Sequence, residues 1–258
     1  MSAMQNGSEI AVQATAAALV EVELVDDQML TWRLWQLVDS SFPTGAFAHS
    51  GGLEAASHAG LLPAADVATL ESWLAAQAAS ACSLTLPFVL AALPLGRRRD
   101  AAAAAALSAS LGAHLAGSGA AKRASAAAGS AMLRAGGAAF PELAGAMDAA
   151  RDACLPAPPH GAVALGYLCG ARGVPPAQAG RALLFAQLRD GCSAATRLGL
   201  VGPMAAAALQ ARAAPRCEAL LRAALAADVA PEDAAAASPL ADALQCGHDA
   251  LFARLFQS

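Results

Sequence analysis

Alanine dominates this chain of 258 residues, and residues 101–106 are all alanine. Alanine is the best helix former, because it loses no side-chain entropy in a helix. Aromatic residues make up only 4% of the chain. Runs of β-branched or aromatic residues with a period of two, which mark strands, are nearly absent. The sequence therefore predicts an all-α protein.

Hydrophobic spacing, interrupted by glycine and proline, predicts about ten helices with short links in a single compact domain. Asp66 and Asp100 are expected to be N-caps, and Pro87 is expected to bend the helix that contains it. The expected helices cover residues 28–39, 50–60, 66–93, 100–115, 122–136, 140–154, 161–171, 176–189, 190–213, 215–227 and 239–258.

The acidic residues are unevenly distributed, because five of them precede Arg33, the first basic residue. We interpret residues 1–27 as a disordered acidic tail and residues 28–258 as the helical domain. The domain is nearly neutral, which argues against a nucleic-acid partner. The absence of Lys and Arg before Arg33 argues against a secretory signal or a transit peptide, so a cytoplasmic location is expected.

The six cysteines are widely spaced and form no C-x-x-C pair, which argues against a structural zinc site and fits a reducing compartment. One segment imitates a membrane span, because no charge lies between Glu71 and Arg97. Its polar residues, its small residues and the two prolines Pro87 and Pro94 favour a buried core helix instead. No membrane association is expected.

The segment DSSFPTGAFAHSGGLE, residues 39–54, is unusually varied for this chain. Pro43 fixes a φ angle, Gly45 permits a positive φ, and Ser50 or His49 can bind the free N–H groups of the next helix. Glu54 suits the positive end of that helix. A tight turn between helices explains these residues, but it does not explain Phe42, Phe47 and His49. Large side chains at a bend are typical of an interaction surface or a pocket mouth.

Other kinds of site find little support. His49 with Ser50, Ser41 or Asp39 has the residue types of a nucleophilic enzyme, but no G-x-S-x-G elbow is present. No glycine-rich phosphate loop exists either. The histidines show no strong metal-ligand spacing, so no tight metal site is expected and His49 is at most a transient ligand. The sequence predicts no catalytic residue, and a helical serine hydrolase using Ser50 and His49 remains an alternative.

The segment LWQLVDSSFPTGAFAHSGGLEAASHAG resembles the opening signature of the urease accessory protein UreF family, in a form similar to plant and algal members. Four later blocks agree in order, so the resemblance spans residues 28–258. They are KRASAAAGSAML, PHGAVALG, DGCSAATRLGLVG and SPLADALQCGHDALFARLFQS. One departure is that Pro203 and a run of alanines follow Gly202, where family members usually have glutamines.

The resemblance implies an all-α, non-catalytic scaffold for urease maturation. Such a scaffold binds the accessory protein UreD, also called UreH, and recruits the GTPase UreG. The complex delivers nickel to apo-urease, and the scaffold forms a homodimer within it. Nickel is then the cargo of the complex, and no tightly bound cofactor is expected. A chaperone that itself binds nickel remains an alternative.

Three surfaces follow as predictions from the residues and the resemblance together. The bend at Pro43–Gly45 presents Phe42, Phe47 and His49 beside Arg197, facing partners or a metal route; the alternative for Arg197 is a salt bridge with Glu54 or Asp190. The second surface is the end of the last helix, with Arg254 and Phe256, which docks on UreD or else closes the protein's own core. The third is Lys122 and Arg123, which face UreG or else form a solvated helical turn.

Overall fold

The computed structural model describes residues 29–257 in two units, which divide between Asp39 and Ser40. The first unit contains a helix over residues 29–38, as predicted, in which Trp32 and Trp35 make an edge-to-face contact with ring centroids 5.2 Å apart. The predicted acidic tail, residues 1–27, lies outside the described residues.

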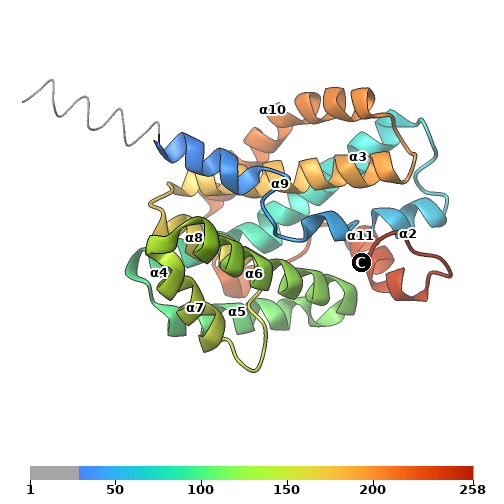
Figure 1. Ribbon diagram of the computed structural model, residues 1–258. Coiled ribbons are helices and arrows are strands. Elements are labelled where there is room, and N and C mark those ends of the chain that lie inside the picture. The colour runs from blue at the N-terminus through green and yellow to red at the C-terminus, as the bar shows by residue number, and fades with distance from the viewer. Residues whose placement is uncertain (1–28, 258) are drawn as a thin grey trace, which may run out of the picture. The chain divides into compact units, whose positions relative to one another are not determined.

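Residues 40–257 are all helical or irregular, with no strand among them, which confirms the all-α prediction (Figure 1). The α-helices are α2 Leu53–His58, α3 Val67–Ser80, α4 Leu86–Arg98, α5 Ala101–His114, α6 Gly119–Ala139, α7 Ala144–Ala153, α8 Gly161–Ala171, α9 Pro176–Arg197, α10 Pro203–Ala227 and α11 Pro239–Cys246. The short helical turns are η1 Ala46–Ala48, η2 Ala81–Thr85, η3 Leu115–Gly117, η4 Pro141–Leu143, η5 Pro231–Asp233 and η6 Gly247–Ala250.

Two of the helix starts follow directly from the predicted caps. A carboxylate oxygen of Asp66 accepts a hydrogen bond from Thr69 N at 3.0 Å, at the start of α3. Asp100 accepts one from Ala103 N at 3.0 Å, at the start of α5. Each carboxylate therefore meets one of the N–H groups that a helix start leaves without an internal partner.

Just before Pro87, where a bend was predicted, the helical run contains a π-helical turn, η2, between α3 and α4. Proline has no N–H, so it leaves the carbonyl of Ser83, four residues earlier, without its usual helical donor. Ala235 N donates to that carbonyl at 3.2 Å instead. The segment after α10 therefore compensates for the interruption of the helix.

The core of one half of the fold is the packing of α4 against α8, and three glycines allow these helices to approach closely. A Cβ atom added to Gly166 would lie 2.2 Å from the carbonyl oxygen of Val89, and one added to Gly170 would lie 2.0 Å from that of Leu93. From the other side, a Cβ on Gly96 would lie 1.9 Å from the carbonyl oxygen of Tyr167. The observed spacing of α4 and α8 therefore requires glycine at these three positions. Helices α5 and α6 pack against this pair, and α7 packs against α5 and α6.

The other half contains α2, α3, α9, α10 and α11, with a leucine-rich core. Its buried residues include Leu53, Leu70, Leu74, Leu188 and Leu209. The continuous helical run Val67–Arg98 crosses both halves. This run is long and apolar enough to span a membrane by length and composition, yet 56% of its apolar window is buried inside the protein, as in a core helix.

Two predicted helix boundaries in the second half are wrong. Residues 176–189 and 190–213 were expected to be separate helices, but α9 continues through Gly191 to Arg197. A Cβ on Gly191 would lie 2.5 Å from Cδ2 of Leu74, so this glycine gives α3 room and does not end the helix. The break comes instead at Gly199, which has a φ of 71°. Helix α10 then runs through Pro215, where a new helix was expected.

The third wrong boundary is at the C-terminus. The last helix was expected to run to the end of the chain, but α11 ends at Cys246 and residues 251–257 are not helical. Near the end of the chain, Glu54 is a competing acceptor, because it binds the backbone N–H groups of Leu255 and Phe256. A helix would need the same N–H groups for its own carbonyls.

Candidate protein-interaction surface

The elbow, residues 40–52, turns the chain into α2 by means of several positive φ angles. Gly45 has a φ of 73°, as predicted, and Gly52, immediately before α2, has a φ of 86°. A Cβ on Gly52 would also lie 3.0 Å from the carbonyl oxygen of Ala241 in α11. The second glycine of HSGGLE therefore serves both the backbone turn and the close approach of α2 to α11.

The aromatic residues of the elbow face different environments. Phe47 is 61% exposed, which is unusual for so large an apolar side chain. Phe42 is only 8% exposed, so the prediction that it is presented outward with Phe47 is wrong. Its side chain contributes to the interior, where burial of a phenylalanine is favourable. Pro43 is exposed, and His49 is partly buried.

Glu54, in the first turn of α2, is the centre of the contact between the elbow and the C-terminal segment. It is 1% exposed and accepts three hydrogen bonds: from Nε2 of His248 at 2.8 Å, from Leu255 N at 2.5 Å and from Phe256 N at 3.2 Å. A carboxylate is stable in the interior only when donors surround it in this way. Glu54 therefore holds the C-terminal segment in place.

The sequence indicated no specific role for His248. Its side chain is fully buried, and the hydrogen bond to Glu54 spans 194 positions of the sequence. We assign the ring proton to Nε2, because this tautomer gives Glu54 a donor. Such a long-range pair has no local sequence signal, which is why sequence reasoning missed it.

Arg197, the last residue of α9, lies between the elbow and the C-terminal segment. Its guanidinium carbon is 4.0 Å from the ring centroid of Phe47 and 4.2 Å from that of Phe256. The guanidinium also donates a hydrogen bond from Nη1 to the carbonyl oxygen of Phe47. The predicted proximity of Phe47 and Arg197 is therefore present, and Arg197 clamps two aromatic rings by cation–π contacts.

Neither salt bridge considered for Arg197 is formed. Glu54 is occupied by His248 and by two backbone N–H groups, and Asp190 pairs with Arg189 at 2.7 Å. Burial raises the pKa of the Asp190 carboxyl, and Arg189 offsets part of that rise. Arg197 is thus held by aromatic faces and a carbonyl oxygen, an arrangement that suits the planar guanidinium and would not suit lysine.

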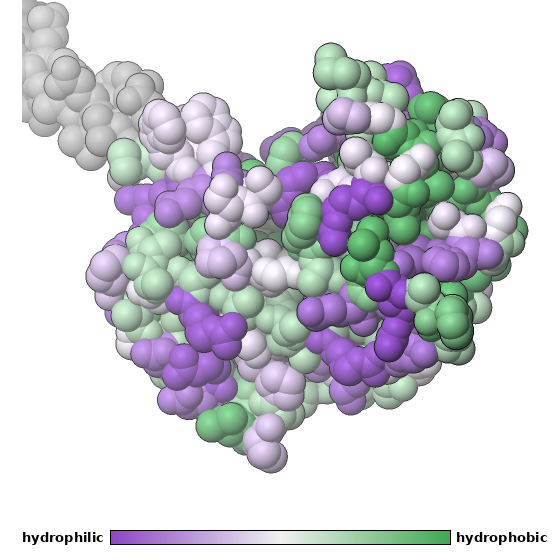
Figure 2. Space-filling view, turned by 45° about the vertical axis from the view of Figure 1, so that its right-hand side comes forward, coloured by the Kyte–Doolittle hydropathy of each residue, from purple (hydrophilic) through white to green (hydrophobic). Residues whose placement is uncertain are grey.

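The C-terminal segment, residues 251–257, combines one anchored side chain with exposed apolar ones. Phe256 is 5% exposed, and Gln257 N donates to the carbonyl oxygen of Ala48 at 2.8 Å. Phe252 is fully exposed, and Leu255 is 55% exposed. The segment lies beside α2 and α11 (Figure 1), on the side of the molecule that Figure 2 brings forward, where hydrophobic and hydrophilic residues alternate.

The predicted basic residues Arg123 and Arg254 meet at one carboxylate. Asp249 pairs with Arg123 at 2.5 Å and with Arg254 at 3.3 Å, and all three side chains are largely exposed. The hydrogen bond from Arg123 is the main reason why the pKa of Asp249 lies below its usual value. Arg123 therefore ties α6 to η6, which precedes the C-terminal segment. Lys122, its neighbour on α6, is exposed.

A cavity of about 300 Å³, with a mainly apolar wall, lies behind the elbow. His49, Ser50, Gln77, Gln187 and Asp190 are among its lining residues. Burial lowers the pKa of His49, and His248 lowers it further. Ser50 is buried, and its Oγ accepts a long hydrogen bond from Glu54 N at 3.4 Å, within the turn that it was expected to cap. The predicted residues His49 and Ser50 thus face inward, toward this cavity.

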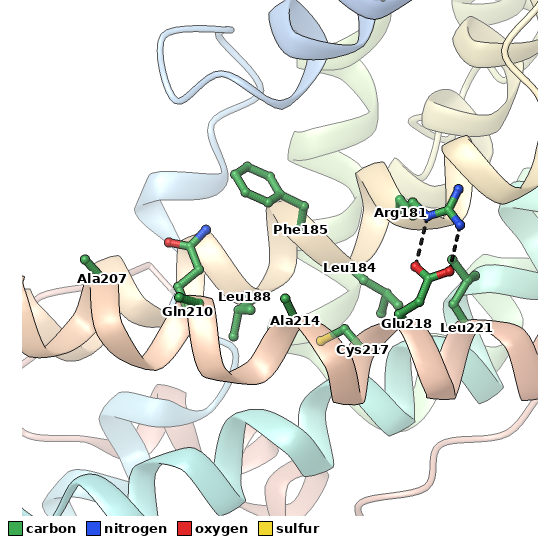
Figure 3. Close-up of a pocket in the computed structure, with 11 residues that line it drawn as sticks. Arg181, Leu184, Phe185, Leu188, Ala207, Gln210, Ala214, Cys217, Glu218 and Leu221 are labelled. Atoms are coloured by element: carbon green, nitrogen blue, oxygen red, sulfur yellow. Dashed lines mark hydrogen bonds and ion pairs between the residues drawn. The ribbon is translucent and has the colours of Figure 1, made fainter.

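A second cavity, of about 480 Å³, lies between α9 and α10 and was not foreseen from the sequence. Figure 3 shows its lining side chains, which come from these two helices, with the Arg181–Glu218 ion pair at one end. Phe185 is 44% exposed above it. In the sequence, a phenylalanine within an alanine-rich segment is the feature that could have indicated this cavity.

Comparisons with known proteins agree with this architecture. The UreF family model matches residues 64–214. The chain is 38% identical to urease accessory protein F of Oryza sativa subsp. indica, over 89% of this chain and 86% of that protein. It is also 38% identical to urease accessory protein F of Arabidopsis thaliana, over 89% of this chain and 93% of that protein. The chain belongs to the UreF family.

A bacterial relative extends the comparison, because urease accessory protein UreF of Azorhizobium caulinodans is 33% identical over 87% of this chain and 94% of that protein. In this UreF family member, several of the signature residues serve packing. A Cβ on Gly129 would lie 2.2 Å from the carbonyl oxygen of Pro159, and Ser125 Oγ accepts a hydrogen bond from Gly161 N at 3.2 Å. Much of the signature therefore maintains the fold.

Proposed function

We propose that this UreF family member acts in the maturation of urease as a non-catalytic scaffold. Its curated relatives in plants and bacteria carry the name of urease accessory protein. Phe47 packs on Arg197, and Glu54 binds the C-terminal segment. The large apolar side chains of Phe47, Phe252 and Leu255 nevertheless remain exposed to solvent, and this observation carries the proposal. Exposed apolar groups framed by charged residues are typical of protein-binding surfaces.

We infer that the partners are those implied by the family: UreD, also called UreH, the GTPase UreG and apo-urease. The C-terminal segment is the proposed contact with UreD, because Phe252 and Leu255 gain burial only when another protein covers them. Lys122 and Arg123 are the proposed UreG-facing residues. A homodimer within the complex is part of the same proposal.

Nickel is the proposed cargo of the complex. A group of three or more His, Cys, Asp and Glu residues that could hold a metal ion is not found in the part of the chain that the structure describes. The cavity behind the elbow has His49 and Asp190 in its wall, and it offers a place for a transient metal route. His49 is the ligand proposed there, because burial lowers its pKa and favours the neutral imidazole that binds metals.

The decisive experiment co-expresses apo-urease, UreD and UreG with or without this chain, and measures urease activity and bound nickel. We expect activation only when the chain is present. Full nickel loading and activity without it would refute the scaffold proposal.

Two substitutions separate docking of the C-terminal segment from closure of the protein's own core. Phe252→Ala removes a fully exposed ring, so capture of UreD should fall while the free energy of unfolding stays within about 0.5 kcal/mol. Phe256→Ala removes a buried ring and should cost about 3 kcal/mol. Leu155→Ala, which removes an exposed apolar side chain elsewhere, is the matched control. Normal UreD capture by the Phe252 variant would contradict docking.

A further inference from the structure

The backbone of the elbow is bound by donors from distant parts of the chain. Gln257 N, in the C-terminal segment, donates to the carbonyl oxygen of Ala48 at 2.8 Å. Arg197, whose guanidinium also lies over the ring of Phe256, donates to the carbonyl oxygen of the preceding residue, Phe47. Two successive carbonyl groups of the elbow therefore depend on the C-terminal segment, one directly and one through Arg197.

The next residue, His49, lines the cavity behind the elbow. His248 lies close enough to lower the pKa of His49, and the same His248 binds Glu54, which holds the C-terminal segment. Gln77, another lining residue, donates from Nε2 to the carbonyl oxygen of Gly51 at 2.8 Å. One short stretch of backbone thus both forms part of the cavity wall and anchors the C-terminal segment.

The elbow has little internal structure to hold it in place without these donors. Its helical turn η1 has only three residues, and Gly45 and Gly51 have φ angles of 73° and 58°. Glycine loses more conformational freedom on folding than any other residue, so ordering such a segment is costly in entropy. The hydrogen bonds from outside the elbow offset that cost.

We propose that the C-terminal segment acts as a latch on the elbow: while it is bound, it holds His49 in the cavity wall, and its release opens the cavity to solvent. Release removes the donor to Ala48 and the ring that Arg197 contacts, so the two residues before His49 lose constraints together. The same segment carries the exposed side chain of Phe252, so a protein that binds it there can couple its binding to opening. This consequence rests on the proposed function, whereas the latch is a property of the isolated chain.

The test measures how fast diethyl pyrocarbonate modifies His49 in the full-length protein alone, with the modified residue located by mass spectrometry. Gln257→Pro removes the N–H group that binds Ala48 and leaves the acceptor in place. We expect the rate at His49 to rise by about fivefold, as for a local opening equilibrium that loses one hydrogen bond. Gln257→Ala keeps the N–H group and is the matched control, and the exposed His58 is the reference within each molecule.

A second pair of variants tests the latch through a different contact. Arg197→Gln removes both cation–π contacts and should also raise the rate at His49. Arg212→Gln breaks an exposed ion pair elsewhere and should leave the rate unchanged. His160, which is 4% exposed, should react as slowly in every variant as in the parent protein. Equal rates at His49 in the proline and alanine variants, or a parallel rise at His160, would overturn the proposal.

Discussion

Glu54 shows how a single buried carboxylate can organise two segments that are distant in sequence. Its oxygens accept one hydrogen bond from an imidazole and two from backbone N–H groups of the C-terminal segment. The same segment supplies Phe256, which packs on Arg197. At the residue scale, the interaction surface therefore depends on one side chain that is itself buried.

We predict that Glu54→Gln lowers the free energy of unfolding by about 2 kcal/mol, because the amide NH₂ faces donors and leaves a buried hydrogen bond unmade. Urea unfolding followed by circular dichroism measures the change. Glu71→Gln is the control, since Glu71 forms an exposed ion pair with Arg212 at 3.0 Å and should change stability by less than about 1 kcal/mol. Equal effects of the two substitutions would show that Glu54 does not organise the segment.

At the scale of the helices, small residues set how closely the elements approach. The contact of α4 with α8 depends on glycines at which any side chain would collide with the backbone of the facing helix. This packing explains why a chain rich in alanine and glycine forms a core with few aromatic residues. Dispersion contacts between closely spaced helices replace part of what larger side chains supply elsewhere.

We predict that Gly170→Ala destabilises the protein by about 1–3 kcal/mol, although alanine is the better helix former by about 1 kcal/mol. The new methyl group would lie 2.0 Å from the carbonyl oxygen of Leu93, so α4 and α8 must separate. Gly145→Ala in α7 is the matched control, because nothing lies within 4 Å of its Cβ position and the change should stabilise slightly. Thermal melting of both variants measures the difference. A Gly170 variant as stable as the parent would contradict the close-packing account.

The helices also show which structural features could be predicted from the sequence alone. The caps Asp66 and Asp100 were predictable, because a carboxylate and the N–H groups that it binds lie three residues apart. Gly191 was wrongly expected to lie near a break between two helices, because its role depends on Leu74 of another helix. The expected C-terminal helix was too long, and the residues beyond α11 include Leu255 and Phe256, whose N–H groups bind Glu54, a residue distant in sequence. Sequence reasoning succeeded where the energetics are local.

The features of the candidate site likewise include some that could be predicted from the sequence and some that could not. The contact of Phe47 with Arg197 was anticipated from two family blocks, whereas the burial of Phe42 was not. The exposure of Phe252 had no local signal, because exposure is a property of the assembled fold.

At the scale of the whole molecule, two partly enclosed histidines couple stability to pH. Burial is the main cause that lowers the pKa of both His49 and His160; the second cause is His248 for His49 and Lys122 for His160. The unfolded chain, in which a histidine has a pKa of about 6.5, then binds more protons than the folded one at mildly acidic pH. The free energy of unfolding therefore falls as the pH falls through this range.

The other groups with shifted pKa values contribute less to the change in stability over this pH range. Burial raises the pKa values of Asp190 and Asp242, which favours the folded state on acidification, but carboxyl groups start from an ordinary value near 4. Burial raises the pKa of Cys82 and Cys192 to about 11, far above neutrality. A comparison between pH 7.5 and pH 6.0 is thus governed by the imidazoles.

We predict that urea unfolding gives a lower stability at pH 6.0 than at pH 7.5, and that the double variant His49→Gln with His160→Gln loses most of this difference. His58→Gln, at an exposed position, should retain it. The double variant is compared with itself at the two pH values, so any constant loss of packing cancels. A stability that rises on acidification, or a pH dependence that survives in the double variant, would mean that these imidazoles are not held neutral by the fold.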